Sequence, residues 1–262
     1  MSYIIICTVA FVVSGLTLFS GFGLGTLLMP AFALFFPIEV AIAATAIVHL
    51  ANNIFKVILV GRKADPVTVL KFALPAAIFA MLGALLLNYF TTIEPLVQYV
   101  FAGRTCTVSA VKLVIAALIF TFAIMELTPI FKKLSFDARF IPLGGALSGF
   151  FGGISGFQGA LRTAFLIRAG LDKEIFIGTM VVSAVVVDIS RLTIYGVTFF
   201  SRDFAILQNQ GGIGLVIAGS LCAFGGAFVG SRLLKKITMR TIRVIVGTML
   251  LILAVALGSG LI

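Results

Sequence analysis

Charged residues in this chain are concentrated in short segments that separate long apolar runs. Six runs have the length of a helix that crosses the hydrocarbon core of a bilayer, about 20 residues. They lie at 38–60, 69–90, 107–127, 174–199, 210–232 and 242–261. Because these runs are continuously apolar rather than alternating, they predict transmembrane helices and not the strands of a membrane barrel.

Two further runs, 3–36 and 140–170, are each interrupted by a glycine-rich break. The first break is Ser20-Gly21-Phe22-Gly23-Leu24-Gly25, and the second is Ser155-Gly156-Phe157-Gln158-Gly159. Only about a dozen apolar residues follow each break, too few to cross a bilayer as a straight helix. We therefore expect re-entrant hairpins, in which the second helix begins inside the membrane with its free N–H groups and positive end at depth.

The order of these features repeats at an offset of about 135 residues. The two breaks align, Asn53 aligns with Asp188, and Lys56 aligns with Arg191. This predicts an internal duplication with repeats at 1–131 and 132–262 in a single membrane domain. The expected fold class is an all-α polytopic membrane protein of two inverted repeats, each a re-entrant helical hairpin plus three transmembrane helices.

Basic residues determine the expected orientation of the repeats. If both interrupted runs crossed the membrane fully, the basic residues of 232–243 would lie opposite those of 132–139, against the positive-inside rule. With re-entrant hairpins both clusters are cytoplasmic and both termini are outside. The alternative for the first hairpin is a first limb that crosses fully, which would make the N-terminus cytoplasmic.

Composition agrees with a membrane protein: 61% of residues are hydrophobic, 11% are charged, and the mean hydropathy is +1.24. The net charge of +10 follows from basic loops at the membrane surface, where they contact lipids, so it does not indicate a nucleic-acid partner. The three cysteines have no metal or redox spacing, and we expect no cofactor and no metal site.

These features resemble the sulfite exporter TauE/SafE family of membrane permeases. The resemblance is carried by the first break followed by Pro30, by the second break followed by Gly178-Thr179, and by small-residue segments such as Leu82-Gly83-Ala84 and Gly225-Gly226-Ala227. It implies transport, often export, of sulfite, sulfonates and related anions across a bacterial inner membrane. The second break departs from the family pattern at Gln158 and Arg162 and lacks a proline matching Pro30.

The breaks are the first candidate substrate site. Backbone N–H groups would hold the oxygens of an anion together with two hydroxyl groups. The groups concerned are the N–H groups of Gly23, Gly25, Thr26, Gln158, Gly159 and Ala160 and the hydroxyls of Ser20 and Ser155. The alternative is that the glycines only kink the helices or allow close packing.

Polar side chains at membrane depth complete the candidate site. Arg162 either binds a sulfonate or carboxylate through its planar fork or forms a structural pair with Asp188. Asp188 and Arg191 share a helix face, as an ion pair or as a proton-coupling site. His49 and Asn53 are one turn apart and line a polar cavity or bond a neighbouring helix. Lys56 either snorkels to the surface or attracts anions at the cytoplasmic side.

The resulting prediction is a secondary transporter of small anions, an exporter, possessing no enzymatic activity. An anion channel and a non-transporting assembly factor are the alternatives. The sequence has no Walker A motif, no HExxH and a single histidine, which disfavours a pump or an intramembrane enzyme. The predicted substrate-binding residues are Ser20, Gly21, Phe22, Gly23, Gly25, Thr26, His49, Asn53, Ser155, Gly156, Phe157, Gln158, Gly159, Arg162, Asp188 and Arg191.

Overall fold

The structure is a computed structural model. It describes residues 1–17, 24–101, 103–128, 135–198, 205, 208, 211–233 and 239–262. The tip of the first break, Ser20, Gly21, Phe22 and Gly23, lies outside the described residues, as do Lys132 and Lys133 and the segment 234–238.

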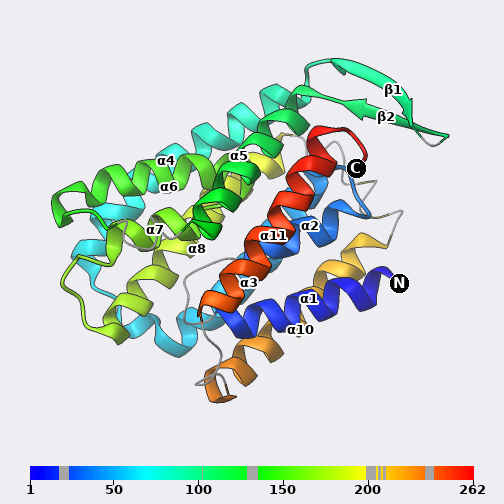
Figure 1. The fold of residues 1–262 in the computed structure, drawn as a ribbon. Helices are drawn as coiled ribbons and strands as arrows, with labels where there is room; N and C mark the ends of the chain where they lie inside the picture. The colour runs from blue at the N-terminus through cyan, green and yellow to red at the C-terminus, as the bar shows by residue number, and fades with distance from the viewer. Residues whose placement is uncertain are drawn as a thin grey trace.

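The described chain is almost entirely helical, which confirms the all-α class (Figure 1). The first half contains α1 (Ser2–Thr17), α2 (Leu24–Ala33), α3 (Ile38–Val60), the 3-10 turn η1 (Gly61–Lys63), α4 (Pro66–Thr91), strands β1 (Val97–Phe101) and β2 (Arg104–Val108), and α5 (Ala110–Leu127). The second half contains η3 (Ala138–Phe140), α6 (Ile141–Ser155), α7 (Gly159–Leu166), α8 (Lys173–Val197), α10 (Gly212–Leu233) and α11 (Met239–Gly258).

Four of the described helical segments are long and apolar enough to cross a membrane. They are Ile38–Lys63, Pro66–Thr91, Lys173–Val197 and Gly212–Gly230. Shorter apolar helices occur at Ser2–Gly15, Leu24–Ala33, Ala110–Met125 and Gly247–Gly258. The two glycine-interrupted runs are each divided into a longer and a shorter helix, α1 with α2 and α6 with α7.

A β-hairpin precedes α5, and the sequence analysis did not predict it. Its strands pair antiparallel from Val97 opposite Val108 to Phe101 opposite Arg104, with Gly103 at a φ of 78°. The strands are rich in β-branched and aromatic residues, which favour this conformation. The helix predicted from position 107 therefore begins three residues later, at Ala110, where the Ser109 side chain accepts a hydrogen bond from the N–H of Lys112.

Glycines of α6 allow it to pack directly on the backbone of α4. A Cβ atom added to Gly145 would lie 2.1 Å from the carbonyl oxygen of Phe72, and one added to Gly149 would lie 2.1 Å from that of Ala76. Real Cβ atoms do not approach oxygen so closely, so only glycine fits at both positions. Small residues at helix contacts are the usual means of close packing between membrane helices.

The same kind of contact joins α1 to α10. A Cβ atom on Gly226 would lie 2.0 Å from the carbonyl oxygen of Phe11, and one on Gly230 would lie 2.5 Å from that of Gly15. In both pairs the contacts advance in the same direction along the two chains, so α1 runs parallel to α10 and α6 runs parallel to α4. The first helix of each interrupted run, α1 or α6, is thus packed on a long helix of the other half.

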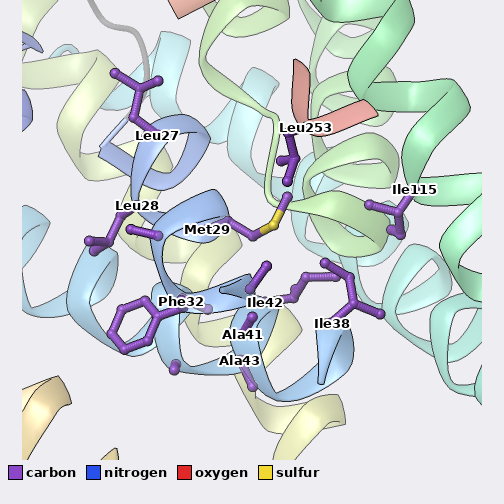
Figure 2. Close-up of a cluster of buried hydrophobic side chains, with 14 of the residues drawn as sticks. Leu27, Leu28, Met29, Phe32, Ile38, Ala41, Ile42, Ala43, Ile115 and Leu253 are labelled. Atoms are coloured by element: carbon purple, nitrogen blue, oxygen red, sulfur yellow. The ribbon is translucent and has the colours of Figure 1, made fainter. Parts of the chain in front are cut away.

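Helix α2 lies inside the molecule, surrounded by apolar side chains from three other helices (Figure 2). Its residues Leu28, Met29 and Phe32 are at most 1% exposed. They belong to one cluster with Ile42 of α3, Ile115 of α5 and Leu253 of α11. By contrast, Leu70 and Leu74 on α4 are 65% and 57% exposed, as expected of a helix that faces lipid.

The helix ends group into two sets. The end of α2, the start of α3, the end of α4, the start of α5 and the C-terminal residues surround one pocket of about 570 Å³. The turn η1, which follows α3, and the start of α8 are joined by an ion pair between Lys63 and Glu174. The segment before α6 meets the end of α7, where the N–H of Phe136 donates to the carbonyl of Ala164 at 3.2 Å.

Candidate functional site

The second glycine break forms a sharp turn inside the molecule. Gly156 follows α6 with a φ of 81°, in the left-handed region that favours glycine, and its N–H donates to the carbonyl of Gly152 at 2.9 Å. The Ser148 hydroxyl donates to the carbonyl of Gln158 at 2.9 Å and fixes the start of α7 against α6. The predicted interruption is therefore confirmed, and its backbone geometry depends on glycine.

The start of α2 approaches this turn from the other half of the chain. A Cβ atom added to Gly25 would lie 3.5 Å from the carbonyl oxygen of Gly156 and 3.7 Å from the Cδ2 atom of His49. Thr26 follows Gly25 within α2 and is half-buried. Gly25, the last residue of the first break, thus lies against the second break, as the hairpin interpretation predicts.

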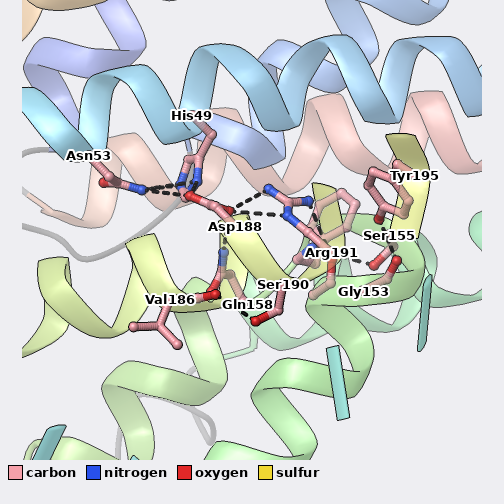
Figure 3. A network of polar contacts seen from close by, with 12 residues as sticks. His49, Asn53, Gly153, Ser155, Gln158, Val186, Asp188, Ser190, Arg191 and Tyr195 are labelled. Carbon is pink, nitrogen blue, oxygen red and sulfur yellow. Dashed lines mark hydrogen bonds and ion pairs between the residues drawn. The ribbon is translucent and has the colours of Figure 1, made fainter. Parts of the chain in front are cut away.

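Asp188 of α8 lies at the centre of a buried polar network (Figure 3). Its Oδ2 atom lies 2.6 Å from Nδ1 of His49 and accepts from Nδ2 of Asn53 at 3.1 Å. His49 and Asn53 are also in contact with each other, since Asn53 Nδ2 lies 3.0 Å from His49 Nδ1. The expected shared face of His49 and Asn53 is confirmed, and the face is turned toward α8.

The other carboxylate oxygen of Asp188 also accepts several hydrogen bonds. Its Oδ1 atom accepts from Nη2 and Nε of Arg191 at 2.7 and 3.1 Å and from Nε2 of Gln158 at 3.0 Å. The remaining Nη1 of Arg191 donates to the carbonyl of Gly152 at 3.3 Å. Asp188 and Arg191 therefore form a buried ion pair, which joins α8 to the second hairpin.

Arg162 forms no ion pair with Asp188, although such a pair was one of the two alternatives that the sequence left open. It is 5% exposed, and its Nη1 donates to Oε1 of Gln158 at 2.9 Å. Gln158 thus stands between the two, with its NH₂ group on Asp188 and its carbonyl oxygen on Arg162. The Nε of Arg162 is buried and has no hydrogen-bond partner among the described residues.

Lys56 is buried as well, at 7% exposed, so the expectation that it snorkels to the surface is wrong. Its ammonium group makes no hydrogen bond or ion pair with any described residue.

Several groups expected to face an anion are engaged elsewhere. The Ser155 hydroxyl donates to the carbonyl of Phe151 at 2.9 Å, and the N–H of Gln158 donates to the carbonyl of Gly156 at 3.2 Å. The Phe157 ring is 3% exposed and stacks on Phe122 with centroids 5.6 Å apart. Ser155 and Phe157 thus support the hairpin internally, because the turn uses its own donors.

Further polar atoms lie at depth, and the sequence analysis singled out neither Thr45 nor Ser183. Thr45 Oγ1, Asn52 Nδ2 and Ser183 Oγ are buried without a hydrogen-bond partner among the described residues. Asn52 accepts from the hydroxyl of Ser14 on α1 at 3.1 Å. Thr45, His49, Asn52 and Lys56 recur at helical spacing within one apolar run, and this spacing is the signal that identifies them as one face.

The described residues contain no group of three or more histidine, cysteine, aspartate or glutamate side chains that could hold a metal ion. What distinguishes the site is its charge. Among the side chains whose burial is described, the buried lysine and arginines, Lys56, Arg162 and Arg191, outnumber the one buried carboxylate, Asp188. This excess of buried basic residues is suited to an anion.

Comparison with known proteins agrees with this chemistry. The family model described as Sulfite exporter TauE/SafE matches residues 5–257, nearly the whole chain. No curated protein and no solved structure matches the chain. Members of the matching family are membrane transporters of sulfite or related anions rather than enzymes. The chain therefore belongs to the sulfite exporter TauE/SafE family and is an integral membrane protein.

Proposed function

We propose that this protein is a secondary transporter that exports small sulfur-containing or organic oxyanions, such as sulfite or sulfonates, across a bacterial inner membrane. The substrate would bind at the second glycine turn, against Arg162. The observation that carries the proposal is the buried guanidinium of Arg162, whose Nε has no partner among the described residues.

A charged Arg162 whose hydrogen-bond donors are not all satisfied destabilises the protein. A guanidinium keeps its proton in proteins, and leaving a buried charge uncompensated costs several kcal/mol. The planar fork offers parallel N–H donors that match the oxygens of a sulfonate or sulfite group. Gly25 and Gly156 let the two breaks approach each other closely beside His49, since a Cβ atom added to Gly25 would lie 3.5 Å from the carbonyl oxygen of Gly156 and 3.7 Å from Cδ2 of His49.

The proposal includes two inverted repeats, which would give alternating access to one site. Asn53 and Asp188 support this, because they are 135 positions apart, equal to the repeat offset, and they contact each other at 3.1 Å. Equivalent residues of a duplicated chain meet only near the axis that relates the copies. The contact between α1 and α10 is likewise the counterpart of that between α6 and α4.

Proton coupling would use the contact between His49 and Asp188, since both are titratable and lie beside the anion site. A proton shared by these two groups would change the charge that the substrate meets. We propose this as the coupling site, and we expect the transported anion and membrane lipids to be partners of the chain.

The proposed function is tested by measuring anion flux into proteoliposomes that contain Arg162→Gln, Arg162→Lys or the wild-type chain. Loss of one charge-assisted contact should weaken binding by roughly 10- to 100-fold. Arg162→Lys should rescue only part of the loss, because a point charge does not replace a planar fork. Lys71→Gln, which removes an exposed charge on α4, is the matched control.

Saturating flux with counterflow, lost in Arg162→Gln and retained in Lys71→Gln, would support a transporter. Flux that rises linearly with anion concentration would favour a channel. Normal, saturating flux in Arg162→Gln would contradict the placement of the substrate at this arginine.

A further inference from the structure

We propose that Gln158 is a positioning residue of the anion site: its side-chain amide links Asp188 to Arg162 and orients the guanidinium so that the edge carrying Nε is left for the substrate. This inference rests on the proposed function, because it concerns how Arg162 is presented to the anion. It makes the side chain of Gln158, which the sequence analysis considered as a backbone N–H donor, a determinant of specificity for oxyanions.

The first observation is that the amide of Gln158 is hydrogen-bonded at both ends. Its Nε2 donates to Oδ1 of Asp188 at 3.0 Å, and its Oε1 accepts from Nη1 of Arg162 at 2.9 Å. A carboxylate only accepts and a guanidinium only donates, so a single orientation of the amide satisfies both partners. The side chain is 2% exposed, and these two partners therefore fix its orientation.

The second observation is that the backbone of Gln158 is held in place as well. The Ser148 hydroxyl donates to the carbonyl of Gln158 at 2.9 Å, and the N–H of Arg162 donates to the same carbonyl at 3.1 Å. A Cβ atom added to Gly152 would lie 3.0 Å from the Cβ of Gln158, so glycine at 152 leaves room for this side chain. The amide thus reaches Arg162 from a position that α6 and α7 both fix.

The third observation concerns the donors of Arg162 that remain. A guanidinium has two edges with parallel N–H donors, one formed by Nε and Nη2 and the other by Nη1 and Nη2. Gln158 occupies Nη1, whereas Nε is buried with no hydrogen-bond partner among the described residues. The edge that carries Nε is therefore the one left for an anion, and its two donors match two oxygens of a sulfonate or sulfite group.

The fourth observation is a difference between the two repeats. At the offset of 135 residues, Gln158 aligns with Gly23 and Arg162 aligns with Leu27. Leu27 is 5% exposed and belongs to the apolar cluster around α2. The second repeat thus contains both the amide and the guanidinium, one helical turn apart, and the first repeat contains neither. This is expected if the amide serves the guanidinium.

The test compares two monoanions, methanesulfonate and bromide. Methanesulfonate can accept from two parallel donors at once, whereas bromide is spherical and its binding depends less on how the fork is oriented. Affinities are measured on purified full-length protein in detergent, at constant ionic strength, by ligand-induced stabilisation.

Two variants probe the amide. Gln158→Met keeps the length of the side chain and removes both hydrogen bonds. Gln158→Glu can accept from Arg162 but cannot donate to Asp188, and it adds a negative charge. The same two substitutions at Gln98, which lies exposed on β1, are the matched controls.

We expect the wild type to bind methanesulfonate at least about tenfold more tightly than bromide. Gln158→Met should lose about tenfold in affinity for methanesulfonate and at most about threefold for bromide. Gln158→Glu should lose affinity for both anions, because its carboxylate takes their place beside Arg162. Both Gln98 variants should behave as the wild type.

Equal losses for the two anions in Gln158→Met would mean that Gln158 only maintains the shape of the site, and no loss would mean that Arg162 is oriented without it. Either result would overturn the inference, as would methanesulfonate binding that survives in Gln158→Glu. If neither variant folds, a wild type that binds bromide as tightly as methanesulfonate would still overturn it. All these results leave the proposed function intact, whereas wild-type protein that binds neither methanesulfonate nor sulfite would overturn the proposed function itself.

Discussion

Replacing Asp188 with asparagine should destabilise this protein far more than any substitution of an exposed acid. The side chain is completely buried and its two oxygens face donors from His49, Asn53, Arg191 and Gln158. Asparagine has nearly the same shape, but one of its oxygens is exchanged for an NH₂ group. Whichever way the amide turns, it sets a donor against a donor and leaves the Arg191 charge unpaired.

Removing one partner of a buried ion pair costs about 3–5 kcal/mol. The chain supplies a matched control in the ion pair of Lys63 and Glu174, whose side chains are 58% and 71% exposed. An exposed pair of this kind contributes about 0–1 kcal/mol, so Glu174→Gln should be almost neutral. The comparison therefore separates the effect of burial from the effect of removing a negative charge.

The assay is the free energy of unfolding of purified protein in mixed micelles, titrated with a denaturing detergent. We expect Asp188→Asn to lower this free energy by about 3–5 kcal/mol and Glu174→Gln by no more than about 1 kcal/mol. The reasoning would be refuted if the two variants unfolded at the same detergent fraction, because Asp188 would then not be holding α3, α8 and the second hairpin together.

Two further predictions concern packing and orientation. Gly149→Ala should lower the unfolding midpoint sharply, because the new Cβ would lie 2.1 Å from the carbonyl oxygen of Ala76. Gly196→Ala is the control and should leave the midpoint unchanged, because a Cβ at Gly196 would have nothing within 4 Å. Similar midpoints for the two variants would contradict the close contact of α6 with α4. Single cysteines introduced at Lys63, Lys133 and Lys236 in a cysteine-free background should react with a membrane-impermeant reagent on one side of the membrane and a cysteine at Thr91 on the other. Labelling of Lys133 and Lys236 on opposite sides would rule out inverted repeats.

The helices and the breaks could be predicted because both depend on local properties of the chain. An apolar run of membrane length forms a helix wherever it is inserted, since every backbone group must be bonded within it. Gly156 needs a positive φ, and no neighbouring part of the fold has to be known to expect a turn there. The residues of α3, Ile38–Val60, match the predicted run 38–60 for this reason.

The β-hairpin was missed because its signal is short and ambiguous. Val97–Phe101 has only five residues, mostly apolar but including Gln98, and it lies near a longer apolar run; only Gly103 indicates a reversal of direction. The choice between the start of a helix and a strand at 104–108 depends on pairing with Val97–Phe101, which is a tertiary property. The first residues of the predicted span 107–127 were therefore assigned to the wrong element.

The composition of the polar site could be predicted, but not the pairing within it. Sequence spacing placed Arg191 next to Asp188 and left open whether Arg162 was a second partner. The structure decides this through Gln158, which occupies the position between Asp188 and Arg162. No local rule could anticipate it, because Gln158 reaches Asp188 only once the hairpin is packed on α8.

Polar groups at membrane depth stabilise the protein when they have hydrogen-bond partners and destabilise it when they have none. Both kinds occur within this one cluster. The five contacts of Asp188 stabilise the meeting point of α3, α8 and the second hairpin, so the glycine turn is held in place without a ligand. The Nε of Arg162 is buried and has no hydrogen-bond partner among the described residues. Its desolvation is a cost that the Asp188 network offsets and that a bound anion would relieve. A protein whose only task was to pack helices would gain stability by losing this charge. The position of Arg162 just behind a rigid glycine turn is explained if a negatively charged substrate passes there.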